Sequence, residues 1–138
     1  MTTYISSALR RQVIARANDR CEYCRFPQSA SLFAFEMEHI IAEKHRGEST
    51  FANLALACPY CNRAKGTDLG SIDPQTNQLT PFFNPRTQGW YQHFECLDDA
   101  TISPYTAVGR VTVLILKFNE SQRIQERQRL LTINQYPQ

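Results

Sequence analysis

The sequence has no strong excess of charge of either sign. Its 138 residues contain 15 Lys and Arg against 13 Asp and Glu, which gives a formal net charge of +2 with neutral histidines. So small a charge cannot hold a polyanion by long-range attraction. Any affinity for nucleic acid must therefore come from cations that the fold places locally.

Long apolar runs are also absent. No stretch approaches the ~20 residues that a membrane-spanning helix needs, and residues 1–19 are polar and charged where a signal peptide would be apolar. Internal repeats and low-complexity tracts are missing too. We therefore expect one soluble, cytoplasmic domain over residues 1–138 that makes no contact with a membrane.

The number of cysteines argues against a disulfide framework, since five cannot all pair within one chain. Four of them form two Cys-x-x-Cys pairs, Cys21 with Cys24 and Cys58 with Cys61, a spacing that lets four thiolates close a tetrahedron around one zinc ion. A single pair is also typical of a redox site, but two pairs are better explained by a structural zinc. Cys96 stands apart, and we interpret it as a core thiol.

Local patterns predict helices on both sides of the cysteine-rich segment. Ser6 or Ser7 can cap a first helix that runs to about Ala17. Apolar residues at helical spacing favour a second helix after a Thr106 cap, although their β-branched content also suits a buried strand. Asn119 can cap a last helix, whose basic face we expect to consist of solvated arginines: Arg123, Arg127 and Arg129.

Two further segments have weaker signals. The density of Gly, Pro, Asp, Asn and Thr over 66–85 predicts an ordered loop. Residues 90–96 and 101–103 resemble two short strands about a turn. The fold class predicted from these patterns is α+β, with a zinc-binding and catalytic core over about 19–68 and an extension over about 69–138.

Between the cysteine pairs, the sequence predicts a strand–strand–helix unit. Ile40 and Ile41, followed by Leu54 and Leu56, indicate two short strands about a polar loop that contains glycine. Pro59 then suits the first turn of a helix. Such a unit brings the end of its first strand over the helix that follows.

This arrangement would gather groups suited to phosphodiester hydrolysis. Glu38 and Asn62 offer a carboxylate and an amide oxygen to a hard divalent cation, magnesium or manganese. His39 can act as the general base that takes a proton from the attacking water. Arg63 and Lys65 can neutralise neighbouring phosphates of DNA.

Four short motifs lie between residues 21 and 66: Cys21-x-x-Cys24, Glu38-His39-Ile40-Ile41, Asn53-Leu54 and Cys58-x-x-Cys61-Asn62-x-x-Lys65. Together they resemble the HNH endonucleases, the ββα-metal nucleases, and in particular small bacterial stand-alone members with a four-cysteine zinc site. The resemblance implies a ββα-metal core. It also implies that His39 is the general base, that Glu38 and Asn62 bind the catalytic metal, and that Asn53 orders the loop.

We therefore expect a metal-dependent DNA endonuclease with a structural zinc and a catalytic magnesium or manganese. The alternative is a zinc-stabilised module that binds DNA or protein without hydrolysis, and Glu38 keeps it open because the commoner family residue is Asp. A zinc hydrolase acting on another substrate is less favoured. The cysteine pairs use the clustered thiols, and three separated histidines, His39, His45 and His93, make a poor second zinc site.

Overall fold

The computed structural model describes residues 4–137. Its first helix, α1 (Ser7–Arg16), begins at the predicted cap, where the Ser6 hydroxyl accepts a hydrogen bond from the Leu9 amide at 3.1 Å. Ala17 closes the helix, and Val13 is fully buried on its inner face. This confirms the predicted N-terminal helix.

The predicted strand–strand–helix unit is present. Strands β1 (Glu36–His39) and β2 (Leu54–Ala57) pair antiparallel, with Glu36 opposite Ala57 and His39 opposite Leu54. Helix α2 (Pro59–Lys65) follows, with Cys58 as its N-cap and Pro59 in its first turn. Short 3-10 turns, η1 (Gln28–Ala30) and η2 (Glu43–His45), interrupt the loops before and after β1.

Residues 66–85 are not simply the ordered loop that composition predicted. They contain an antiparallel hairpin of β3 (Gly70–Ile72) and β4 (Leu79–Pro81). The strands approach so closely at Gly70 that a Cβ atom there would lie 2.2 Å from the Thr80 carbonyl oxygen. The turn is fastened by Asp73, whose carboxylate accepts hydrogen bonds from the amide and hydroxyl of Thr76.

The strand predicted from residue 90 onward is wrong in its first half. Residues Trp90–His93 form a helical turn, α3, at whose start the Gln92 side chain accepts a hydrogen bond from the Gly89 amide at 3.2 Å. The second half is β5 (Phe94–Cys96), which pairs antiparallel with β6 (Ile102–Pro104) as expected. The mixed helices and short antiparallel strands confirm the predicted α+β class.

The last two helices are α4 (Ala107–Ile115) and α5 (Ser121–Leu131). Thr106 caps α4 as predicted, so the β-branched run is helical. The cap predicted for α5 is wrong, because Glu120 holds that position. The Asn119 side chain is instead engaged by both backbone groups of Ile102, at 2.9 Å each.

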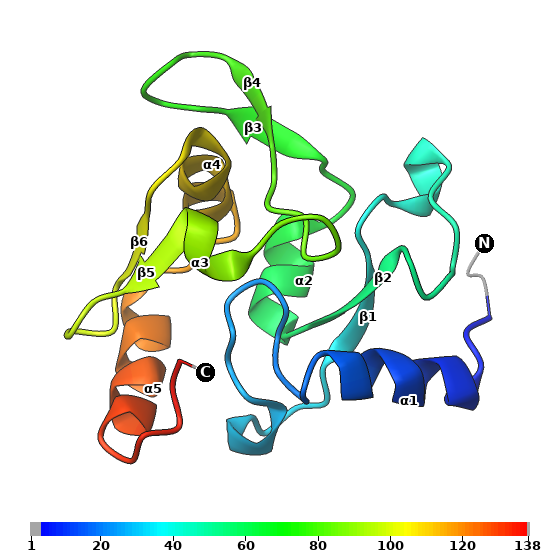
Figure 1. Ribbon diagram of the computed structural model, residues 1–138, viewed down its shortest axis with the longest axis horizontal. Helices are drawn as coiled ribbons and strands as arrows, with labels where there is room; N and C mark the ends of the chain where they lie inside the picture. The colour runs from blue at the N-terminus through cyan, green and yellow to red at the C-terminus, as the bar shows by residue number, and fades with distance from the viewer. Residues whose placement is uncertain (1–3, 138) are drawn as a thin grey trace.

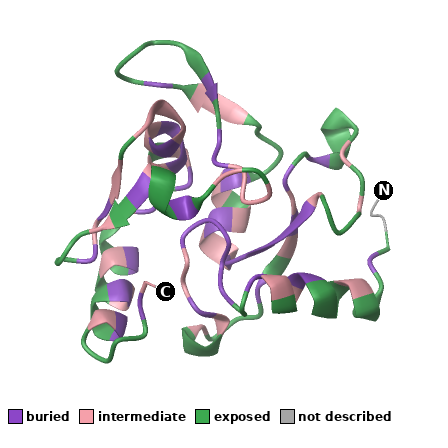
Figure 2. Cartoon of the chain, in the orientation of Figure 1, coloured by how far each residue is buried: buried purple, intermediate pink, exposed green. Residues whose placement is uncertain are grey.

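Helix α2 lies at the centre of the molecule, between the β1–β2 sheet and the C-terminal elements (Figure 1). Every residue of β2 is buried, as Figure 2 shows. One apolar cluster joins Val13 of α1 and Leu56 of β2 to Phe94 of β5 and Phe118 beyond α4. Within the described residues, no helix has the length and apolar character needed to cross a bilayer.

Candidate metal and catalytic site

The four paired cysteines form one buried cluster. Their sulfur atoms all lie within 4.8 Å of one another. Cys58 caps α2 and Cys61 lies in its first turn, while Cys21 and Cys24 come from the loop after α1. The sulfurs of Cys24 and Cys58 are 3.7 Å apart, close to the ~3.8 Å edge of a tetrahedron with ~2.3 Å zinc–sulfur bonds. The donor set and its spacing therefore fit one zinc ion.

Electrostatics within the cluster differ from one thiol to the next. Burial raises the pKa of Cys21 and of Cys61 well above the usual range. Burial also disfavours the Cys24 thiolate, but hydrogen bonds from the other three cysteines and the nearby positive charge of Arg123 lower the pKa of Cys24 well below its ordinary value. Burial and the neighbouring hydrogen bonds and charge thus act in opposite directions on these thiols.

Arg123 of α5 lies directly against this cluster. Its Nη2 donates to the Cys61 sulfur at 3.1 Å and lies 3.9 Å from that of Cys58, and its Nη1 donates to the carbonyl oxygens of Leu116 and Lys117. Four thiolates and one Zn²⁺ would carry a net charge of −2, of which Arg123 offsets one unit. Although burial disfavours its charge, the neighbouring thiolates raise the pKa of Arg123 further above its usual value.

The basic face predicted for the last helix is therefore wrong at two of its three positions. Arg123 and Arg127 are 3% and 1% exposed, and only Arg129 faces solvent. Arg127 donates to the Ala100 carbonyl at 2.9 Å and to the Asn119 side chain at 3.0 Å. Helical spacing identified a common face, but that face packs inward.

C-terminal residues cover the first cysteine pair. The Tyr136 hydroxyl donates to the Cys24 carbonyl at 2.5 Å, and the Trp90 indole donates to the Tyr23 carbonyl at 2.8 Å. Glu22 accepts from the Leu56 amide at 2.8 Å and forms an ion pair with Arg86. Contacts from both the central unit and the extension thus surround the cysteine cluster.

His39 lies at the end of β1 and is partly exposed. Its Nε2 is 2.8 Å from the hydroxyl of Ser49, which belongs to the loop between β1 and β2. The contact orients the ring through one of its two nitrogens. Sequence reasoning missed Ser49, since a serine in a polar loop has no distinguishing pattern.

Asn53 fastens that same loop. Its Oδ1 accepts from the Ile41 amide, and its Nδ2 donates to the carbonyl oxygens of Ile41 and Glu48, each at 2.9 Å. Gly47 is required beside it, because a Cβ atom there would lie 1.6 Å from the Ile41 carbonyl oxygen. These contacts fix the backbone that directly follows His39.

Glu38 and Lys65 form a buried ion pair, with 2.9 Å between Nζ and Oε1. The ammonium also donates to the carbonyl oxygens of His39 and Ile40 at 3.1 Å each. Burial raises the pKa of Glu38, and the charge and hydrogen bond of Lys65 act against that shift. All three ammonium protons are accepted by β1 and by Ile40, the residue after it, so Lys65 connects α2 to the sheet. The predicted contact of Lys65 with a DNA phosphate stays a prediction.

The remaining site residues lie on α2. Asn62 is partly exposed, and its side chain has no hydrogen bond to any residue between 4 and 137. Arg63 is exposed. No hydrogen bond within that range connects Asn62 with Glu38 or His39, so the catalytic metal set also stays a prediction.

Comparison with known proteins identifies the segment that contains these groups. Residues 21–68 match the family model of the HNH endonucleases. The match supports membership of this segment in the nuclease family. It includes both cysteine pairs, His39, Asn53 and Asn62. The chain matches none of the curated proteins and none of the solved structures with which it was compared.

Outside the HNH segment, a partly buried ion pair holds the extension together. Arg110 of α4 forms a two-pronged ion pair with the fully buried Asp73, at 2.8 and 2.9 Å. It joins the β3–β4 hairpin to the rest of the extension. Sequence reasoning missed this pair, because the two residues are 37 positions apart.

Proposed function

We propose that the protein is a metal-dependent DNA endonuclease of the HNH type. The observation that carries the proposal is the placement of His39, whose ring is partly exposed at the end of β1 and oriented by Ser49, within a segment that matches the HNH family. The Asn53 contacts hold the adjoining loop in place. The rest of the proposal follows from the chemistry of these groups.

His39 is the general base. An imidazole can take a proton from water near neutral pH, and the ring is accessible to solvent while its orientation is fixed by a hydrogen bond. Ser49 acts through His39 and is a positioning residue. Arg63, exposed on α2 beside Asn62, supplies a cation for a neighbouring phosphate.

A catalytic magnesium or manganese ion would be held by the oxygen atoms of Asn62 and Glu38. Both donors are oxygens, which suits hard divalent cations better than zinc. Lys65 engages Oε1 of Glu38, which leaves Oε2 for the cation. When bound, such an ion supplies charge stabilisation at the phosphate and at the departing oxygen.

A structural zinc ion would be held by Cys21, Cys24, Cys58 and Cys61. All four thiols are buried, and two backbone amides already point at the sulfurs: Cys24 N lies 3.5 Å from Cys21 Sγ and Cys61 N lies 3.4 Å from Cys58 Sγ. Zinc bound in this way contributes folding free energy to the unit that carries His39.

The test is cleavage of supercoiled plasmid DNA by the purified protein with magnesium or manganese. His39→Ala is expected to lose roughly 10²–10⁴-fold in rate, because the base acts in the chemical step. His45→Ala is the matched control, since His45 is exposed on η2 nearby. DNA affinity and zinc content should stay unchanged in both variants. Cleavage by His39→Ala at the wild-type rate would refute the assignment.

A second candidate is a zinc-stabilised DNA-binding module without hydrolytic activity. The observation in its favour is that Glu38 is 6% exposed and paired with Lys65. In that case the wild-type protein binds DNA but cuts with neither metal, and His39→Ala behaves like the wild type.

A further inference from the structure

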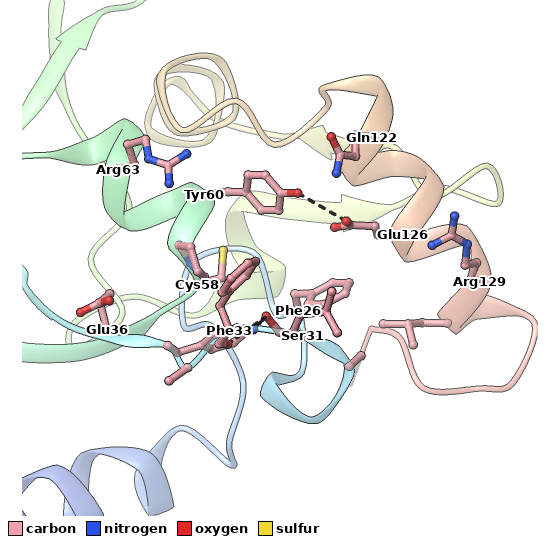
Figure 3. Close-up of a pocket in the computed structure, with 16 residues that line it drawn as sticks. Phe26, Ser31, Phe33, Glu36, Cys58, Tyr60, Arg63, Gln122, Glu126 and Arg129 are labelled. Carbon is pink, nitrogen blue, oxygen red and sulfur yellow. Dashed lines mark hydrogen bonds between the residues drawn. The ribbon is translucent and has the colours of Figure 1, made fainter.

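A cavity of about 650 Å³ lies beside α2, and His39 is not among the residues that line it. It is bounded by the 26–36 segment before β1, by the first turn of α2, and by α5 (Figure 3). Its volume falls within the range of small-molecule sites, roughly 300–1,000 Å³. Of its lining residues, the functions proposed above use only Cys58 and Arg63.

Aromatic rings form much of the lining. Tyr60 of α2 is held in place by its hydroxyl, which donates to Glu126 at 3.4 Å, and by the Arg123 guanidinium, 5.0 Å from the ring centroid. Phe33 enters from the opposing segment and is 70% exposed (Figure 3). A fixed ring and an exposed ring on two walls of one cavity suit a flat, partly polar ligand.

The polar lining is balanced in charge. Glu36 and Glu126 can accept hydrogen bonds from exocyclic amino groups, and Gln122 can both donate and accept. Arg63 and Arg129 are exposed cations. A nucleotide combines what this lining favours, because its base is planar with donors and acceptors and its phosphate is anionic. An apolar helix of a protein partner would cover the Glu36 carboxylate and both arginines without offering them a polar partner.

The cavity is also placed within reach of the candidate catalytic site. Arg63 follows Asn62 directly on α2, and Glu36 begins the strand that ends at His39. Three residue steps along a strand span about 10 Å. That distance corresponds to two or three nucleotides at a rise of ~3.4 Å per nucleotide along one strand.

We propose that this cavity receives one unpaired nucleotide of the DNA strand bound at the candidate site. The base stacks between Phe33 and Tyr60, and Arg63 and Arg129 neutralise the adjacent phosphates. The inference rests on the proposed action on DNA and specifies its substrate class as DNA with an unpaired or weakly paired base. Such a base enters a pocket at a lower unstacking and unpairing cost than a fully paired one.

The test measures binding without cutting. Full-length, zinc-loaded protein is titrated, with no added magnesium or manganese, against two labelled duplexes of equal length. One is fully paired and the other carries a single unpaired 2-aminopurine in the middle. We expect tighter binding of the second duplex and a change in 2-aminopurine fluorescence as the base stacks.

Phe33→Ala removes the exposed ring, and the exposure of Phe33 makes loss of folding an implausible cause of any effect. This variant should reduce the preference for the unpaired base by roughly 5- to 150-fold, the range for one lost base–aromatic stack, and leave affinity for the paired duplex unchanged. Tyr4→Ala is the matched control, since Tyr4 is an 83% exposed aromatic residue outside the cavity.

Equal affinity of the wild type for both duplexes would overturn the inference, and so would a preference that survives Phe33→Ala. These outcomes differ from failure of the proposed function. An uncut plasmid refutes the nuclease proposal even if the binding preference holds, whereas binding of neither duplex refutes the action on DNA itself.

Discussion

Replacing Lys65 with methionine should strongly destabilise the protein near neutral pH. Methionine keeps much of the length of the side chain but removes its charge and its hydrogen bonds. The Lys65 and Glu38 side chains are 2% and 8% exposed, so the substitution leaves a buried carboxylate without a counter-ion. Breaking such a pair from one side costs about 3–5 kcal/mol. For a chain of this length, that corresponds to a fall of roughly 10–20 °C in Tm.

The assay is urea or thermal unfolding of the zinc-loaded protein, followed by circular dichroism. Lys44→Met is the matched control, because Lys44 is exposed on η2. The double variant Glu38→Gln with Lys65→Met removes both charges, and we expect it to recover a large part of the lost free energy of unfolding.

One result would refute this reasoning. If Lys65→Met unfolds within about 1 kcal/mol of the wild type, as Lys44→Met should, the ammonium does not hold α2 to β1. A loss of DNA affinity in the same variant would then support the phosphate contact predicted from the sequence.

Three other substitutions test separate parts of the structure. Asn53→Ala removes three hydrogen bonds from the loop after His39, so it should lower the free energy of unfolding by about 2–3 kcal/mol and reduce plasmid cleavage, measured by melting and by nicking rate. Arg123→Met should weaken zinc retention against a chelator about 10–100-fold, whereas Arg129→Met on the same helix should not. The Arg110 guanidinium and the hydrogen bonds from Thr76 hold the pKa of Asp73 well below its usual range. At a pH above its ordinary pKa, this carboxylate therefore stabilises the fold, and the stabilisation is lost as the pH falls. The gap in stability between wild type and Asp73→Asn should thus be largest at neutral pH and shrink below about pH 4 in acid titrations of unfolding.

The parts of the fold that sequence predicted correctly depend on nearby residues. Ser6 and Thr106 cap helices through bonds to residues three positions away, and Pro59 suits the first turn of a helix whatever the rest of the chain does. The cysteine pairs are equally local, since each Cys-x-x-Cys can supply two ligands by itself.

The parts that could not be predicted depend on which way a polar side chain faces. Lys65 and Arg123 have the composition of solvated cations, yet each points inward to an anionic partner, 27 and 62 positions away respectively. The 66–85 segment is similar, because the residues typical of loops there also form a tight hairpin once Asp73 is anchored by Arg110. These partners are far apart in the sequence and come into contact only in the folded protein.

The residues that cover the cysteine cluster are synthesised after the cysteines, and this order affects when zinc can bind. Arg123 follows Cys61 by 62 positions, and Tyr136 follows Cys24 by 112, so both cysteine pairs leave the ribosome long before the residues that enclose them. We therefore expect zinc to reach the four thiols before these residues cover them. Once Arg123 and Tyr136 are in place, release of the ion requires displacement of α5 and the C-terminal segment. Metal uptake is thus expected to be fast on the growing chain, and exchange in the finished protein slow.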